Sequence, residues 1–185
     1  IVENWYDGFW SMLMFTINVA MLMFTGFLVA NSKPVSKGLM SLAKLPSSSS
    51  SAVLLFMIVT IVLFYLHFAL GMAAAIIFGK ALIVAQEKKG NKLPISLIAA
   101  AAGFCIVFQA GPTAGSPLLV AAPGHFIEDV IGVLPLTDTV LSLPVILMNV
   151  VMAIVFVLVF PRLAKSLSKN DRDEADLEML QRFQN

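Results

Sequence analysis

The sequence predicts an all-α membrane protein with about four to six transmembrane segments, including a hairpin and a discontinuous helix. Of the 185 residues, 59% are hydrophobic and only 12% are charged, and the mean hydropathy is +0.92. This composition lies well outside the range of soluble domains. A spanning helix needs about 20 apolar residues, which limits the number of segments that fit. We expect one membrane unit over residues 1–165 and a polar cytoplasmic tail or linker over 166–185.

Apolar runs place the segments along the chain, and polar residues separate them. The runs expected to form helices in the membrane are 8–30, 52–68, 70–85, 94–108 and 139–160. An amphipathic stretch at 35–45 lies in the surface connection after the first run. The second and third runs break near His67, so that two antiparallel spans or one re-entrant hairpin fit equally well. Pro144 is expected to kink the last span, because proline removes a helical hydrogen bond.

The charged residues indicate the orientation of the chain in the membrane. All 12 Lys and Arg residues fall in segments that can lie on one side, namely 33–44, 80–92 and 162–182. The opposite side then receives only acidic residues, which are Glu3, Asp7, Glu128, Asp129 and Asp138. Lys and Arg are enriched in cytoplasmic loops, so the lysine-bearing side and the C-terminal tail are expected in the cytoplasm.

Residues 109–125 contain three glycines, three prolines and two hydroxyl side chains at apparent membrane depth. Proline removes a backbone donor and glycine weakens a helix, so the backbone should open here. Open backbone at that depth survives only where it is buried in protein or lines a watery cavity. Transporters build ion and small-anion sites in this way. The sequence therefore predicts part of a membrane transporter.

The substrate site is expected around this break. Thr113 and Ser116 lie three residues apart, so on a helix that begins near Pro112 both hydroxyls would face one direction beside free N–H groups. Such a helix end favours a carboxylate. Backbone N–H groups near Gly111 and Gly115 would contribute to the same site. Alternatively, the two hydroxyls bond to carbonyls one turn back in a tightly packed helix.

Two further polar side chains, Gln109 and His67, are candidates beside these groups. Gln109 would donate to the substrate or cap a free carbonyl, and the sequence favours neither role. His67 is an ionisable residue in the middle of an apolar stretch, which marks a functional position in a membrane protein. It would carry a coupled proton, because imidazole changes its charge near physiological pH. The alternative is a neutral histidine bonded to a nearby carbonyl at the hairpin tip.

Other polar residues in the apolar runs have simpler interpretations. Asn18 and Asn149 are expected to be buried amides that form hydrogen bonds between helices. Cys105 is expected to pack as a small core residue, and a single cysteine permits no intramolecular disulfide. His125 with Glu128 and Asp129 offers too few ligands for a metal site. No metal site is therefore expected.

Several motifs resemble the short-chain fatty acid transporter family of the ion transporter superfamily. They are Trp5-Tyr-Asp-Gly-Phe-Trp-Ser, Gly71, Ser116-Pro-Leu-Leu-Val-Ala-Ala-Pro-Gly-His, and Gly132-Val-Leu-Pro-Leu-Thr-Asp-Thr. The likeness is ordered along residues 3–162. The resemblance implies a carrier of the bacterial inner membrane that takes up acetoacetate, butyrate or similar monocarboxylates, coupled to protons or sodium. At the family's Pro-Gly-x position, His125 would line or cap the pocket mouth.

The family also implies an inverted repeat with re-entrant hairpins and broken helices. Its members look about twice as long as this chain, which would then be the first inverted half. Its partners would be the bilayer, short-chain monocarboxylates, and either the missing second half or further copies of itself. No cofactor beyond the coupling cation is implied.

Other functional classes fit the sequence less well than a carrier. A truncated or split subunit that acts only by assembling with a partner half is the main alternative, and a passive channel is less favoured. An intramembrane enzyme that uses His67 with Cys105 or a serine is not expected, because the apolar runs offer no carboxylate and no G-x-S-x-G motif. Nucleic-acid binding is not expected either, because no basic face is present.

Overall fold

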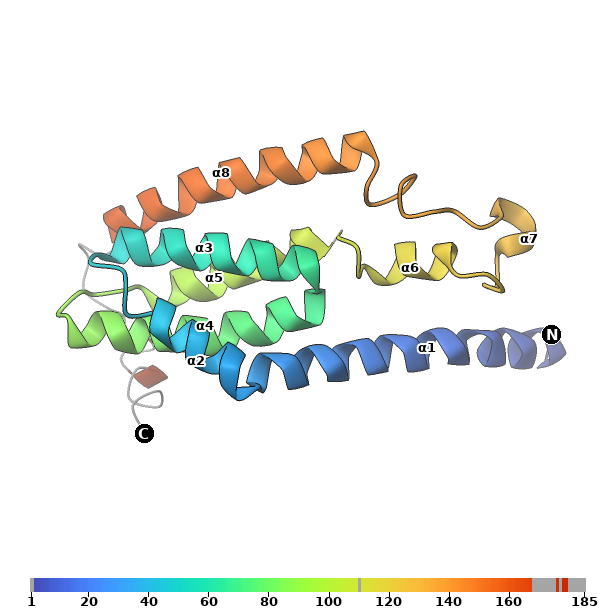
Figure 1. Cartoon of the computed structure of the whole chain (residues 1–185), viewed down its shortest axis with the longest axis horizontal. Helices are drawn as coiled ribbons and strands as arrows, with labels where there is room; N and C mark the ends of the chain where they lie inside the picture. Colours follow the sequence, from blue (N-terminus) through green and yellow to red (C-terminus); the bar gives the residue numbers. More distant parts are fainter. Residues whose placement is uncertain (1, 110, 168–175, 177, 180–185) are drawn as a thin grey trace.

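The computed structural model describes residues 2–109, 111–167, 176 and 178–179, which form helices joined by turns (Figure 1). The helices are α1 (Val2–Asn31), α2 (Lys33–Leu42), α3 (Ser49–Leu66), α4 (Phe68–Lys88), α5 (Ile95–Cys105), η1 (Ile106–Gln109), α6 (Gly115–Ala121), α7 (Glu128–Ile131) and α8 (Leu143–Leu167). Within the described ranges, α1, α3, α4 and α8 are long and apolar enough to cross a membrane. The prediction of an all-α membrane protein is confirmed. The predicted tail at 166–185 lies largely outside the described residues.

Helices α3 and α4 form a hairpin that turns at His67. The hairpin begins where Ser48 and Ser51 form a capping box, in which the Ser48 hydroxyl accepts from the backbone N–H of Ser51. His67 has extended backbone angles (φ −157°, ψ 108°), which end α3 and start α4. Gly90 ends the turn after α4 at φ 77°, a conformation that favours glycine. The turn at His67 lies midway along the molecule. The start of α3 and the end of α4 lie together at one end of the molecule, at the left of Figure 1.

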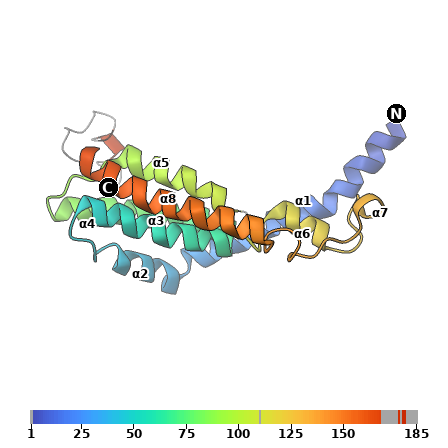
Figure 2. The same ribbon diagram turned by 90° about the horizontal axis from the view of Figure 1, so that it is seen from above.

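The hydrophobic core lies around this hairpin. Phe56 of α3 and Phe78 of α4 are fully buried, and their rings stack at 6.0 Å between centroids. Helix α8 packs along α3, α5 lies against both hairpin helices, and α1 packs on α4 (Figures 1 and 2). Only 6% of the most apolar window of α1 is buried, against 44% for α4. The α1 surface is therefore available to lipid or to another polypeptide.

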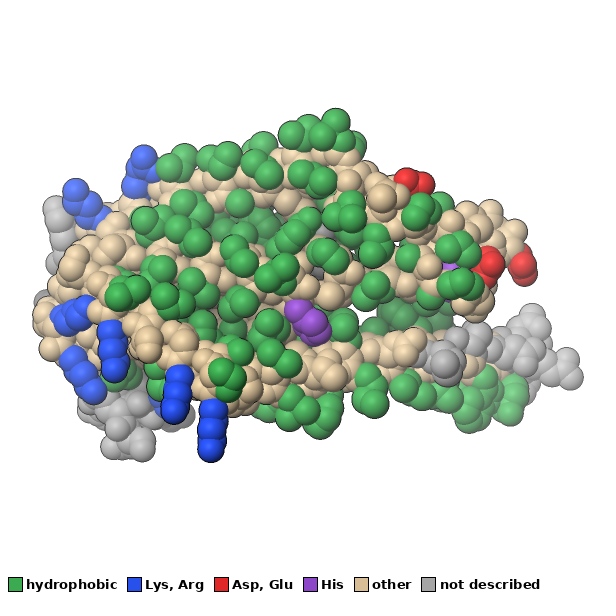
Figure 3. All heavy atoms as spheres, viewed as in Figure 1, with side chains coloured by type: hydrophobic (Ala, Val, Ile, Leu, Met, Phe, Trp, Pro, Cys, Tyr) green, Lys and Arg blue, Asp and Glu red, His purple; other side chains and the backbone are tan. Residues whose placement is uncertain are grey.

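The chain is tied together at the end that carries the lysines. The hydroxyl of Ser50 donates to the carbonyl of Pro161 in α8 at 2.8 Å, and Lys89 Nζ donates to the carbonyl of Pro46 at 2.7 Å. Lys and Arg side chains gather at this end on the face shown in Figure 3, and the acidic side chains of that view lie at the opposite end. This separation agrees with the charge distribution expected from the sequence.

The expected kink at Pro144 is absent from the described α8. The helix begins at Leu143, and the residues before it form turns in which Ser142 N donates to the carbonyl of Thr139 at 3.2 Å. Pro144 thus lies in the first helical turn, where its missing N–H would have had no helical partner. The proline inside the helix is Pro161, near the C-terminal end.

The two membrane amides also differ from expectation. Asn18 is exposed on α1, so its burial was predicted wrongly. Asn149 on α8 is buried, with 6% of its surface exposed, but neither atom of its amide has a hydrogen-bond partner. The prediction that Asn149 forms a hydrogen bond between helices is therefore also wrong. The α3 side chains beside it, such as Val62 and Leu66, are apolar and offer no partner. Cys105 is fully buried as expected, and its Sγ lies 3.3 Å from Thr60 Oγ1.

Asn149→Leu is expected to stabilise the chain by about 1–3 kcal/mol, because leucine removes an unpaired buried amide at similar volume. The measurement is the midpoint of thermal unfolding in detergent micelles, which should rise. Asn18→Leu is the matched control, and it should change stability by less than about 0.5 kcal/mol because Asn18 is exposed. A lower midpoint for Asn149→Leu would show that the amide has a partner in the folded protein.

Candidate substrate site

The interruption between η1 and α6 meets the hairpin turn. Thr113 belongs to the interruption, and its hydroxyl donates to the carbonyl of Leu66, the last residue of α3, at 3.3 Å. The same oxygen accepts from the backbone N–H of Phe68, the first residue of α4, at 3.3 Å. One side chain thus pairs with backbone groups on both sides of the turn. The two broken segments therefore support each other where each lacks helical hydrogen bonds.

Gly111 allows this close approach of two backbones. A Cβ atom at Gly111 would overlap the carbonyl oxygen of Tyr65 and lie 2.9 Å from its carbonyl carbon. Directly after Gly111, a turn forms in which Ala114 N donates to the Gly111 carbonyl at 3.0 Å. The interruption is therefore a compact turn pressed onto the C-terminal end of α3.

Helix α1 packs against the other side of the hairpin turn. A Cβ atom at Gly26 of α1 would lie 2.7 Å from Cβ of Ala69 and 2.8 Å from Cε1 of His67. His67 is half-buried, and its Nδ1 accepts from the backbone N–H of Leu70 at 3.3 Å, which caps α4. The hairpin turn is thus held between α1 and the interruption.

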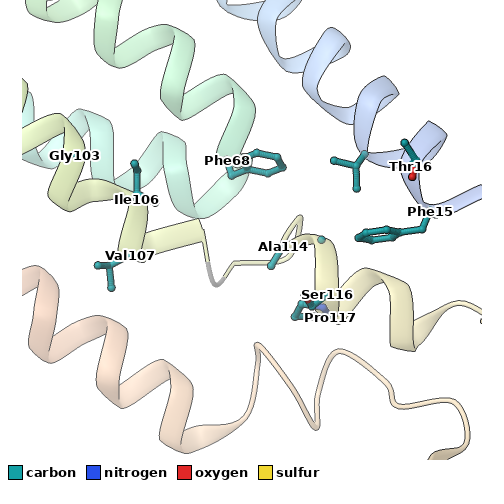
Figure 4. Close-up of a pocket in the computed structure, with 11 residues that line it drawn as sticks. Phe15, Thr16, Phe68, Gly103, Ile106, Val107, Ala114, Ser116 and Pro117 are labelled. Atoms are coloured by element: carbon teal, nitrogen blue, oxygen red, sulfur yellow. The ribbon is translucent and has the colours of Figure 1, made fainter. Parts of the chain in front are cut away.

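We call the contact between the hairpin turn at 66–68 and the interruption at 111–114 the crossing. A cavity of about 880 Å³ lies beside the crossing (Figure 4). It opens between α1, the start of α4, the α5–η1 segment and the start of α6. Its lining residues are Phe15, Thr16, Val19, Phe68, Gly103, Ile106, Val107, Ala114, Gly115, Ser116 and Pro117. Its volume falls within the range of small-molecule sites, and its wall is mostly apolar with two hydroxyl groups, which is typical of such sites.

Helix ends determine the electrostatics of this region. The N-terminal end of α4 lies at the wall of the cavity through Phe68, and this end of a helix carries a partial positive charge. The C-terminal ends of α3 and η1 meet the interruption, and their carbonyl groups carry partial negative charge. An anion and a cation can therefore be attracted to neighbouring parts of one crossing, as in carriers with discontinuous helices.

The structure separates the residues that were predicted to form one substrate site. Gly115 and Ser116 line the cavity, whereas Gly111 and Thr113 hold the crossing. The expectation that Thr113 and Ser116 share one helix that begins near Pro112 is wrong. Helix α6 begins at Gly115, because residues 111–114 form the turn and the Thr113 hydroxyl bonds to the hairpin instead.

His125 lies outside this group. It is buried in the connection between α6 and α7, where Nε2 is 3.1 Å from the carbonyl of Gly132. Its Nδ1 is buried and has no partner. Helix α6 separates it from the crossing, so the structure does not bring His125 together with Ser116. The side chain of Gln109 lies outside the described part of the chain.

Sequence reasoning missed the wall that α1 contributes. Phe15, Thr16 and Val19 line the cavity, and Gly26 contacts the hairpin turn. The glycine in a long apolar run was the one available signal, since glycine permits close helix packing in membranes. In the described ranges, no group of three or more His, Cys, Asp and Glu side chains is placed to hold a metal ion.

Comparison with known proteins gives a family match and two curated relatives. Residues 1–183 match the family described as short chain fatty acid transporter. A curated relative from Escherichia coli (strain K12), named "Putative short-chain fatty acid transporter", is 26% identical over 178 residues, which are 96% of this chain and 39% of the relative. A relative of the same name from Haemophilus influenzae is 25% identical over 149 residues, which are 77% of this chain and 33% of the relative.

No solved structure matches the chain. The chain spans less than half the length of either curated relative. The family match nevertheless covers nearly every residue, including both segments of the crossing. The protein therefore belongs to the short chain fatty acid transporter family.

Proposed function

We propose that this chain forms the first inverted half of a carrier that takes up short-chain monocarboxylates, such as acetoacetate or butyrate, by cation-coupled symport. The observation that supports this most is the crossing of the hairpin turn and the interruption beside a cavity of about 880 Å³. The relatives carry the transporter name and are more than twice as long as the matched segment. A second half would complete the site.

The substrate would bind with its carboxylate near Ser116 and the N-terminal end of α4, and with its short alkyl chain against Phe15 and Ile106. Ser116 supplies a hydroxyl donor in the cavity wall. The positive end of α4 would favour the carboxylate. The apolar wall suits a chain of a few carbons, because burying each CH₂ contributes about 0.8 kcal/mol.

A coupling cation would interact with the carbonyl-bearing side of the crossing. If the cation is a proton, His67 is its proposed carrier. Protonation at Nδ1 would remove the acceptor that caps the N–H of Leu70, so the start of α4 would change when the proton binds. If the cation is sodium, carbonyl groups at the C-terminal ends of α3 and η1 would supply oxygen ligands.

The proposed orientation places the lysine-bearing end and the C-terminal tail in the cytoplasm of a cell whose inner membrane holds the protein. Lysines mark the cytoplasmic side of membrane proteins. In this orientation the hairpin enters from the cytoplasm, and its turn at His67 lies within the membrane. The break in the α5–α6 segment then lies at the same depth.

The test is uptake of labelled butyrate and acetoacetate into proteoliposomes, with proton and sodium gradients imposed separately. The chain is measured alone and joined to a second half of the size that its relatives have. Saturable uptake that needs the second half and one of the gradients would support the carrier and identify the cation. A folded full-length protein without uptake under either gradient would favour a subunit that acts only by assembly.

Ser116→Ala in the full-length carrier is expected to raise the KM for butyrate about tenfold or more, because a hydrogen bond to a charged group contributes about 1.5–3 kcal/mol. Ser96→Ala is the matched control, since Ser96 is exposed on α5 and does not line the cavity. An unchanged KM in Ser116→Ala would exclude this hydroxyl from the carboxylate site.

A further inference from the structure

A second groove lies between α2 and α4, at the end of the molecule that carries the lysines. Its volume is about 750 Å³, and it is distinct from the substrate cavity because the two share no lining residue. Met40 and Lys44 form its wall from α2 and the turn after it. The stripe of α4 from Ile76 to Lys88 forms the other wall.

The α4 wall is apolar nearest the hairpin turn and is most cationic at its other end. Ile76 and Ile77 lie nearest the turn, Lys80 and Val84 follow, and Lys88 ends the helix with Lys89 directly after it. Ile76 is 74% exposed, so a large apolar side chain faces outward at the inner end of the groove. A ligand that fits this groove needs an apolar part toward the middle of the molecule and an anionic part at the lysine end.

Four lysines carry the positive charge of this groove, namely Lys44, Lys80, Lys88 and Lys89, and no carboxylate is among its described lining residues. The ammonium group of Lys89 is held in place, because it donates to the backbone carbonyls of Lys44 and Pro46. Lys44 and Lys88 are exposed at the same end. The positive charges thus gather where a lipid headgroup would lie.

The dimensions match one leaflet of a bilayer. Ile76 and Lys88 are 12 positions apart on one helix, which corresponds to about 18 Å at about 1.5 Å per residue. Half of a hydrocarbon core measures about 15 Å. An acyl chain lying along the stripe from Ile76 to Val84 would therefore place its headgroup at Lys88 and Lys44.

We propose that this groove binds an anionic phospholipid, with an acyl chain against Ile76, Ile77 and Val84 of α4 and the phosphate headgroup between Lys44, Lys88 and Lys89. Basic pockets between helices on the cytoplasmic side of a membrane are suited to such headgroups. A zwitterionic lipid lacks the net negative charge that this set of lysines favours. Bound lipid would fix α2 against the hairpin that carries the crossing.

The test adds dioleoyl phosphatidylglycerol or dioleoyl phosphatidylcholine to the purified chain in neutral detergent. Bound lipid is counted by native mass spectrometry, and the thermal unfolding midpoint is recorded in parallel. Phosphatidylglycerol is expected to remain bound and to raise the midpoint, and phosphatidylcholine to do neither. Equal binding of the two lipids would overturn the proposal.

Two pairs of variants separate the groove from general charge attraction. Lys44→Gln with Lys88→Gln should weaken phosphatidylglycerol binding about 30-fold, which equals about 2 kcal/mol for two lysines. Lys33→Gln with Lys37→Gln removes the same charge from α2 outside the groove and should weaken binding less than about threefold. A similar loss in both pairs would overturn the proposal.

A third variant tests the apolar part without changing charge. Val84→Trp fills the groove and should reduce phosphatidylglycerol binding at least tenfold, with unchanged helical circular dichroism as the criterion of folding. Retained binding would contradict an acyl chain in the groove. If joining a second half to the chain abolishes binding, a polypeptide covers the groove and the lipid proposal fails.

Discussion

Gly111→Ala is expected to destabilise the protein by about 3 kcal/mol or more and to abolish uptake by the full-length carrier. The added Cβ would overlap the carbonyl oxygen of Tyr65 and lie 3.1 Å from its Cα. These are backbone atoms of α3, which cannot rotate away as a flexible side chain does. Overpacking of a well-packed site costs about 1–3 kcal/mol and sometimes more, and a backbone clash belongs at the upper end.

The measurement is thermal unfolding of the chain in detergent, with uptake measured separately in the full-length protein. For a chain of this size, about 3 kcal/mol corresponds to a midpoint lower by about 6–12 °C. Gly103→Ala is the matched control, because a Cβ at Gly103 meets no atom within 4 Å. Alanine favours a helix by about 1 kcal/mol over glycine, so this control should keep or raise the midpoint. Similar midpoints for the two variants would show that the backbones do not approach closely at Gly111.

The close contact at Gly111 explains why the hairpin turn lies beside the interruption. The turn leaves backbone groups of α3 and α4 without helical partners, and the interruption supplies the Thr113 hydroxyl to two of them. In a bilayer, unpaired backbone groups cost several kcal/mol each. Two broken segments at one depth are therefore more stable together than either would be alone.

The helices and their breaks could be predicted from local sequence. Apolar runs of sufficient length mark α1, α3, α4 and α8, because the thickness of hydrocarbon sets the length of a spanning helix. The break at His67 follows from a polar residue between two runs. Pro112 and Pro117 with neighbouring glycines mark the interruption before α6, since these residues disfavour a continuous helix.

The pairing of side chains across the crossing could not be predicted. Spacing along the sequence suggested that Thr113 would face the same way as Ser116, but its partners at Leu66 and Phe68 lie 47 and 45 residues away. Spacing also gave no indication that Asn149 would face apolar side chains of α3. Which face of a helix meets which neighbour depends on tertiary packing, and hydrophobicity is nearly uniform around these helices.

Thr113→Val is expected to destabilise the chain by about 2 kcal/mol or more. Valine keeps the shape of threonine but removes both hydrogen bonds, leaving the carbonyl of Leu66 and the N–H of Phe68 without this partner. Leaving a buried group unsatisfied costs about 1–3 kcal/mol. One of these bonds is exposed and the other partly buried, and both are long at 3.3 Å, so the lower end of the combined range is expected. Thermal unfolding in detergent measures this change, and uptake by the full-length carrier should fall with it.

Two further variants test whether loss of the Thr113 hydroxyl causes the lower stability of Thr113→Val. Thr113→Ser keeps the hydroxyl and should retain most of the stability and uptake. Thr16→Val makes the same replacement at another position of the cavity wall, where the hydroxyl donates only to the Met12 carbonyl one turn back at 2.9 Å. That carbonyl keeps its place in the α1 helix, so the loss should be below about 0.5 kcal/mol. If Thr113→Val and Thr16→Val lose equal stability, the Thr113 hydroxyl does not join the hairpin turn and the interruption. If Thr113→Ser is as unstable as Thr113→Val, packing of the threonine methyl group stabilises the crossing, and hydrogen bonding does not.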